Sequence, residues 1–166
     1  GLMLKKSLYL IGIVSCFLLF TSYARAEVDA EVAYILNTFS FLVCGFLVMW
    51  MAAGFLFLES GLVTTRSVST IAAKNIGKFA IVSIVFYLFG YNLGYGVDEG
   101  GILGFPSLWT DNTSIDTGYS DASDWFFQAL FVCATVSIVS GAVAERIKIW
   151  PFFVFAAILG GFIYPI

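Results

Sequence analysis

The chain has 166 residues, of which 60% are hydrophobic and only 11% are charged. Soluble globular domains contain about half apolar and a quarter charged residues, so this chain has too little polar surface to cover a water-soluble globule. The net charge of −3 and the lack of a Lys/Arg cluster argue against a nucleic-acid partner. The chain contains no His, the commonest general base and metal ligand, which excludes a Ser–His–Asp triad and a zinc hydrolase site in this chain. We expect no enzyme activity, no metal site and no cofactor.

Residues 1–26 have the three parts of a secretory signal peptide. Lys5 and Lys6 form a positive start, residues 8–20 form a short apolar run, and residues 24–26 read Ala-Arg-Ala, a small-x-small cleavage pattern. Cleavage after residue 26 would leave Glu27 as the mature N-terminus. The alternative is an uncleaved first helix, although the apolar run is short for a membrane span.

Four further apolar stretches follow, at about residues 32–58, 76–96, 125–144 and 149–166. Each complete stretch is close to the ~20 residues that cross a hydrocarbon core of ~30 Å. None shows the polar face at a spacing of 3.6 residues that a surface helix of a soluble protein shows. The sequence therefore predicts an all-α membrane protein, with one partial transmembrane domain over residues 27–166.

The charges of the connections predict the orientation in the membrane. Residues 60–75 and 145–148 carry Lys and Arg, whereas residues 97–124 carry six Asp and Glu and no basic residue. Positive connections mark the cytoplasmic side of a membrane. We therefore expect a multi-pass protein of the cell's inner (plasma) membrane with its mature N-terminus outside, which is also what a cleaved signal peptide requires.

Three charged side chains lie close to the predicted spans. Glu59 follows the first span, and it fits either a carboxylate at the membrane interface, stabilised by a helix terminus or a basic neighbour, or a carboxylate at the inner end of a pore. Lys74 and Lys78 lie where the second span begins, and we expect their side chains to extend to the cytoplasmic surface.

Two aromatic residues at the start of the third span share one helix face. Phe127 and Phe131 are spaced i and i+4. Their rings could attract a cation through their π faces or close a hydrophobic gate. Spacing alone favours the ordinary alternative, an aromatic belt at the bilayer interface.

Several segments together resemble the ammonium transporters of the Amt/Mep/Rh family. They are residues 54–62 (GFLFLESGL), 87–96 (YLFGYNLGYG), 126–131 (FFQALF), 138–146 (IVSGAVAER) and 160–165 (GGFIYP). Each string alone is a weak signal, but their order and spacing along the chain are specific. The resemblance covers about residues 41–166, interrupted by the acidic connection.

The resemblance implies a helical bundle of eleven helices that assembles as a homotrimer, with one pore for ammonium or ammonia in each subunit. It places Phe131 at an outer Phe gate and Phe127 at the neighbouring recruitment site, and it makes a cytoplasmic regulatory protein a possible partner. The paired pore histidines of the family lie in later helices, and its recruitment Trp follows the Tyr-Pro pair near Ile166. We therefore expect the chain to be the first third or so of such a protein.

Two other functions are compatible with the sequence. An ammonium sensor of the same fold would differ only in segments beyond residue 166. A membrane-embedded enzyme or a purely structural subunit is the third alternative, but an enzyme would need a nucleophile and a base at one depth in the membrane. Glu59 near one side and the Asp cluster on the other do not meet that need.

Overall fold

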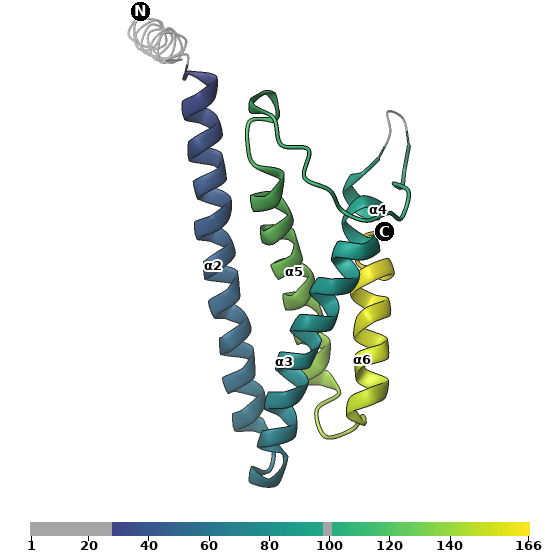
Figure 1. Cartoon of the computed structure of the whole chain (residues 1–166). Helices are drawn as coiled ribbons and strands as arrows, with labels where there is room; N and C mark the ends of the chain where they lie inside the picture. Colours follow the sequence, from purple (N-terminus) through teal and green to yellow (C-terminus); the bar gives the residue numbers. More distant parts are fainter. Residues whose placement is uncertain (1–27, 98–100) are drawn as a thin grey trace, which may run out of the picture.

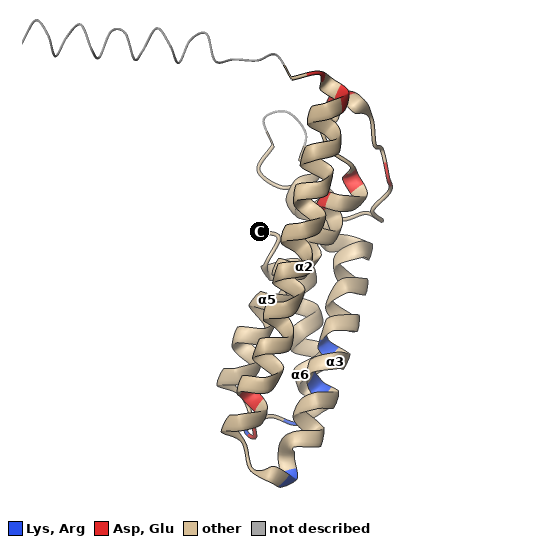
Figure 2. Ribbon diagram, turned by 90° about the vertical axis from the view of Figure 1, so that its left-hand side faces the viewer, with Lys and Arg blue, Asp and Glu red and all other residues tan. Residues whose placement is uncertain are grey.

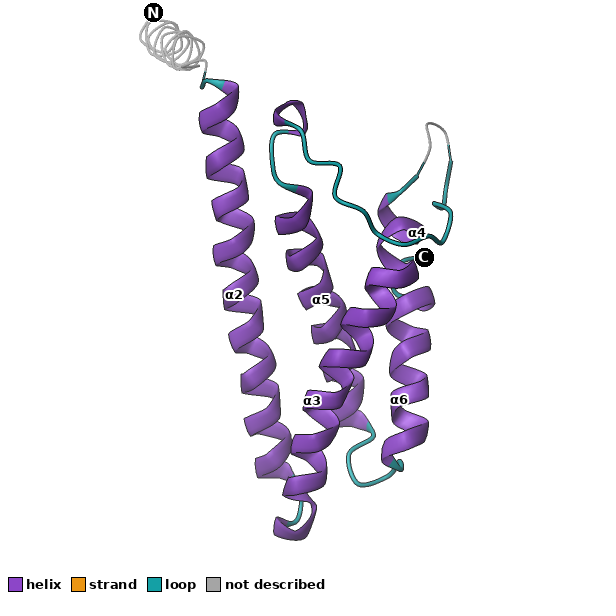
Figure 3. Cartoon of the chain, viewed as in Figure 1, coloured by secondary structure: helices purple, strands orange, loops and turns teal. Residues whose placement is uncertain are grey.

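The computed structural model describes residues 28–97 and 101–166, and these residues form a bundle of long helices (Figure 1). The predicted signal peptide, residues 1–26, lies outside the described residues. In the described part of the chain every regular element is helical (Figure 3). The prediction of an all-α membrane protein is confirmed.

Four helical stretches run along the bundle. The first is α2 (Ala30–Leu62), and the third is α5 (Asp121–Ala142). The second consists of η1 (Thr65–Ser67), α3 (Val68–Val85), the π-helical turn η2 (Phe86–Gly90) and α4 (Tyr91–Tyr95). The fourth consists of α6 (Ile149–Ile158) and a second π-helical turn, η4 (Leu159–Ile163); a short 3₁₀ turn, η3 (Ile115–Thr117), interrupts the long connection before α5.

Three of these stretches are long and apolar enough to cross a membrane: residues 30–62, 65–95 and 121–142. The fourth apolar helix, residues 149–163, is shorter. Most acidic side chains gather at the end of the bundle where α2 begins, and most basic side chains gather toward the opposite end (Figure 2). We call these two ends the acidic end and the basic end.

The predicted connection over residues 60–75 is wrong in its extent. Only residues 63 and 64 separate α2 from η1, and α3 has begun by Val68. Residues 68–75 contain neither Gly nor Pro, so nothing in the backbone interrupts a helix there. The prediction begins the second span only after Lys74 and Asn75, whereas both side chains are buried and paired inside the bundle.

The apolar core is formed by α3, α5 and α6. Its buried members are Val82, Phe86, Ala129, Val132, Cys133, Val136, Phe152 and Ala156. Helix α2 packs along α5, yet Gly45 and Glu59 are its only buried residues among those described. Much of the rest of its surface is apolar and exposed, as expected for a helix that faces lipid or further helices.

The two π-helical turns, η2 and η4, pack against each other through glycine. A Cβ atom on Gly90 would lie 3.2 Å from the carbonyl oxygen of Gly160 and 3.3 Å from that of Gly161. The rings of Phe89 and Phe162 stack beside this contact, with centroids 5.8 Å apart. Small residues let the two backbones approach closely here, which is typical of helix packing in membranes.

The substitution Gly160→Ala tests the close packing of η4 against α3 and α5. The new Cβ atom would lie 2.8 Å from Val82 Cγ1 and 3.2 Å from Val132 Cγ1, and both valines are fully buried. Overpacking of this kind costs about 1–3 kcal/mol, so we expect a lower midpoint of thermal unfolding for the full-length protein in detergent. The matched control is Gly54→Ala in α2, where a Cβ meets nothing within 4 Å; an equal loss in both variants would contradict the proposed packing.

Candidate functional site

A buried polar cluster lies near the basic end, where α2, α3 and α5 meet. Glu59 from α2 is only 3% exposed. Its Oε2 atom accepts hydrogen bonds from Asn75 Nδ2 at 3.3 Å and from Ser140 Oγ at 3.0 Å, and it lies 3.3 Å from Lys74 Nζ. Its Oε1 atom lies 3.9 Å from Lys78 Nζ. One carboxylate therefore joins three helices.

The expectation that Lys74 and Lys78 extend to the surface is wrong. Their exposed fractions are 4% and 2%. Lys74 Nζ donates a hydrogen bond to the backbone oxygen of Ser140 at 3.0 Å and lies 5.1 Å from the centroid of the Phe152 ring. Lys78 Nζ donates to Asn75 Oδ1. The side chains turn inward because a carboxylate and hydrogen-bond acceptors are within reach there, so they do not need water.

A second contact at the basic end joins the two short connections of the chain. The Glu145 carboxylate accepts hydrogen bonds from the backbone nitrogen of Thr64 at 3.1 Å and from its Oγ1 atom at 2.7 Å. The hydrogen bonds from the side chains of Thr64 and Ser67 hold the pKa of Glu145 below its usual range. Glu145 adopts a left-handed backbone conformation, with φ of 60°, which turns the chain from α5 toward α6. The carboxylate thus lies before the first turn of η1, where backbone N–H groups lack helical partners.

Phe127 and Phe131, the two aromatic residues predicted from the sequence to share a helix face, lie together on α5. The ring centroids of Phe127 and Phe131 are 4.9 Å apart in an edge-to-face arrangement, and Phe127 also contacts Phe41 of α2 at 5.4 Å. Phe131 is 38% exposed in this chain. The aromatic face is therefore present in the first half of α5, and part of it is open.

A polar network at the acidic end was not found from the sequence. Asp124 was assigned to the acidic connection, but it lies in the first turn of α5 and is 7% exposed. Its Oδ2 atom accepts a hydrogen bond from Tyr91 Oη at 2.5 Å, and its Oδ1 atom accepts one from Gln128 Nε2 at 3.2 Å. Tyr95 Oη donates to Gln128 Oε1 at 2.8 Å. The spacing of Asp124 and Gln128, four residues apart on a helix, was the available signal.

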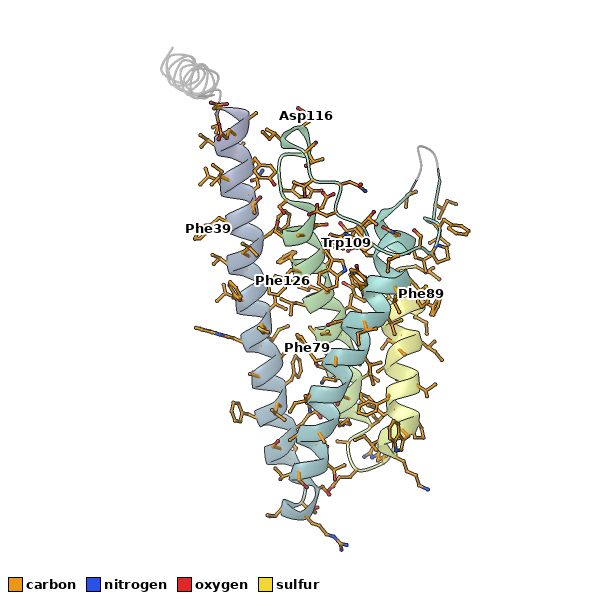
Figure 4. The ribbon with its side chains drawn as sticks, in the orientation of Figure 1. Phe39, Phe79, Phe89, Trp109, Asp116 and Phe126 are labelled. Carbon is orange, nitrogen blue, oxygen red and sulfur yellow. The ribbon has the colours of Figure 1, made fainter. Side chains whose placement is uncertain are left out.

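Aromatic rings cover this network. Trp109, from the connection before α5, lies near the acidic ends of α3 and α5 (Figure 4) and contacts Tyr87, Tyr91 and Trp125 at centroid distances of 5.8–6.4 Å. Its backbone nitrogen donates a hydrogen bond to the carbonyl oxygen of Tyr87 at 3.0 Å. These contacts hold the connection against η2, α4 and the start of α5, where Ser123 and Asp124 are buried.

A cavity of about 430 Å³ opens beside the buried cluster at the basic end. Its lining includes Glu59, Gly141, Glu145 and Arg146. Among residues 28–97 and 101–166, no group of three or more His, Cys, Asp or Glu side chains is placed to hold a metal ion. The charged groups in the lining of this cavity are the carboxylates of Glu59 and Glu145 and the guanidinium group of Arg146.

Long apolar helices, polar groups that are buried in pairs, and charges that separate toward opposite ends define a polytopic α-helical membrane protein. A family model then narrows the class. The model described as Ammonium Transporter Family matches residues 39–166, and the chain belongs to this family.

Ammonium transporters from several organisms are similar to the chain. Amt2 of Archaeoglobus fulgidus is 39% identical over 125 residues, which cover 75% of this chain and 26% of that protein. Amt1 of Methanocaldococcus jannaschii is 34% identical over 79% of this chain and 31% of its own length. The ammonium transporter of Aquifex aeolicus is 30% identical over 96% of this chain and 38% of its own length. The chain thus spans between a quarter and two fifths of these curated relatives.

The substitution Glu59→Gln tests the cluster at the basic end. It would leave the Lys74 ammonium group buried without a countercharge, and breaking a buried ion pair in this way costs about 3–5 kcal/mol. We expect a large drop in the thermal unfolding midpoint of the full-length protein. Glu31→Gln, an exposed carboxylate in the first turn of the same helix, is the matched control and should change the midpoint little. A small effect at Glu59 would show that the ion pair is dispensable.

The substitution Tyr91→Phe tests the network at the acidic end. It removes the hydroxyl that donates to the buried Asp124 carboxylate, and leaving a buried polar group without its partner costs about 1–3 kcal/mol, or more when that group is charged. The midpoint of thermal unfolding should fall accordingly. Tyr34→Phe in α2 is the control, and comparable midpoints for the two variants would argue against the assigned hydrogen bond.

Proposed function

We propose that this chain forms part of a transporter that passes ammonium or ammonia across the membrane through a hydrophobic pore. The support comes from the family to which the chain belongs and from relatives that are named as ammonium transporters. Transport of this kind breaks no covalent bond in its substrate, so no catalytic residue is proposed.

The aromatic face of α5 is the proposed recruitment site and outer gate. Phe131 would be the gate ring and Phe127 its neighbour at the recruitment site. The observation that carries this assignment is the edge-to-face pair with its centroids 4.9 Å apart, of which Phe131 is 38% exposed. Aromatic faces stabilise a cation that loses part of its water shell, and two packed rings can close a path to water. Glu59, which lines a cavity at the basic end, is the proposed carboxylate near the inner end of the pore.

The same bundle supports a proposed orientation and assembly. Basic residues mark the cytoplasmic side, so we propose that the basic end faces the cytoplasm and that the mature N-terminus lies outside the plasma membrane. The α2 helix exposes a long apolar surface, including Phe39, Trp50 and Phe57, which would meet lipid, the remaining helices or the other subunits of a homotrimer. A cytoplasmic regulatory protein would reach the connections at the basic end.

Growth complementation tests the function and the gate together. The full-length protein would be expressed in a yeast strain that lacks ammonium uptake, beside Phe131→Ala and Phe105→Ala. We expect growth on low ammonium with the wild type and with Phe105→Ala, because Phe105 lies in the connection before α5 and is 80% exposed. Phe131→Ala should change the uptake rate of radiolabelled methylammonium at unchanged protein level.

Two outcomes would contradict these assignments. Absence of growth with a wild-type protein that reaches the membrane would overturn the transporter function and favour an ammonium sensor of the same fold. Equal uptake by the wild type and Phe131→Ala would remove Phe131 from the gate while leaving the transporter function intact.

A further inference from the structure

An apolar groove of about 390 Å³ lies between α2 and α3. Three of its lining residues are alanines, Ala52 and Ala53 of α2 and Ala80 of α3. Small residues of this kind let a further helix approach closely in a membrane. The two polar residues in the lining are Asn75 and Lys78. The groove therefore combines a surface for close helix packing with buried polar groups.

The hydrogen-bonding capacity of Lys78 is only partly used. Its ammonium group has three N–H donors, and the side chain is 2% exposed. Among the described residues its one hydrogen-bond acceptor is Asn75 Oδ1. The nearer carboxylate oxygen of Glu59 is 3.9 Å away, which is too far for a hydrogen bond. Two donors of a buried cation thus have no acceptor in the described part of the chain, which is costly unless a further acceptor lies close by.

The charge of the cluster at the basic end is also incomplete. Lys74 and Lys78 share one carboxylate, Glu59, and all three side chains are at least 95% buried. Lys74 makes the shorter contact, at 3.3 Å, and also donates to the carbonyl oxygen of Ser140. Glu145 lines a small cavity together with Lys74, but forms no ion pair with either lysine of the described cluster. One positive charge is therefore left without a counterion, and Lys78 is the group that lacks one.

The sequence limits where this counterion can come from. Apart from Glu59, residues 32–97, 125–144 and 146–166 contain no Asp or Glu. A second copy of the chain therefore has no further carboxylate to offer in its spans, and the acyl chain of a lipid has no hydrogen-bond acceptor. The chain covers 26% of Amt2 of Archaeoglobus fulgidus and 38% of the Aquifex aeolicus transporter. Most of such a protein lies outside the chain and includes further segments that could fill the groove.

We propose that the groove between α2 and α3 is the docking site of a further transmembrane helix of the full-length protein, and that this helix carries an Asp or Glu whose carboxylate pairs with Lys78. The carboxylate accepts hydrogen bonds from the two remaining donors and brings the net charge of the cluster to zero. A neutral acceptor would satisfy the donors but leave the charge uncompensated in the membrane. This pairing does not depend on whether the protein transports ammonium.

Photo-crosslinking in the full-length protein identifies what fills the groove. We would place p-benzoylphenylalanine at the position of Ile76, which lines the groove and is 69% exposed, and irradiate the protein in membranes. Mass spectrometry of the digested protein then identifies the attached peptide. We expect an apolar peptide from outside residues 1–166, with an Asp or Glu within about two helical turns of the attachment point. The control carries the photo-crosslinker at Phe105, in the connection before α5, and should not attach to that peptide.

The other outcomes overturn the proposal. Attachment to lipid alone, or no attachment, would mean that no helix fills the groove. Attachment to residues 1–166 of a neighbouring subunit would make a second copy of this chain the occupant. An attached helix without an acidic residue near the attachment point would leave Lys78 without the proposed counterion.

Thermal unfolding of paired variants tests the ion pair itself. Lys78→Met would leave the partner carboxylate without its cation, and conversion of that residue to its amide would leave Lys78 without its anion. Each single variant of the full-length protein should have a lower unfolding midpoint. The combined variant should recover most of the loss, because neither charge remains unpaired. Lys148→Met, at an exposed position before α6, is the control and should change the midpoint little.

The combined variant also decides the case in which a single variant does not fold. Recovery of folded protein when both charges are removed supports the pair as well as a recovered midpoint does. Losses that simply add in the combined variant would show that the two residues do not interact, and would refute the proposed ion pair.

Discussion

The carboxylate of Glu59 is the point at which polar interactions bind α2, α3 and α5 together. Its Oε2 atom has a partner on α3, Lys74, and another on α5, Ser140. Hydrocarbon cannot solvate an unpaired ion, so each of these side chains depends on the others to stay in the bundle. Gly45 is the only other buried residue of α2 among those described, and aromatic contacts such as Phe41–Phe127 join α2 to α5 nearer the acidic end. The ion cluster therefore adds a polar contact that fixes α2 against its neighbours near the basic end.

The existence of the helices could be predicted from the sequence, but the beginning of α3 could not. Hydropathy treats each charged or polar residue as a cost, so the predicted second span begins only after Lys74 and Asn75. Their partner Glu59 is close in sequence, yet only the turn at residues 63 and 64 brings the two segments together. Asp124 shows the same limitation at the acidic end, because its partner Tyr91 is 33 positions away in the sequence. Spacing along one helix did predict the pair of Phe127 and Phe131.

Helix α5 carries different chemistry on its two sides near the acidic end. Phe127 turns toward Phe41 of α2, whereas Gln128 bonds to Tyr95 of α4. The polar side fixes the helix against its neighbour, so the aromatic side has a defined position relative to α2. A binding site needs rigid support of this kind, because a small displacement of its rings would change how they contact a ligand. The connection that carries Trp109 contributes to this support, although it is an irregular segment.

The short turn between α2 and α3 also bears on how the protein enters the membrane during synthesis. Glu59, Lys74 and Lys78 lie within two adjacent helices that are joined by residues 63 and 64, so these two helices can enter the bilayer as one hairpin. Glu59 then pairs with Lys74 before either helix has to meet lipid alone. Ser140 emerges from the ribosome more than 60 residues later and completes a pairing that already exists. The charges that would oppose insertion of a single helix thus favour insertion of the pair.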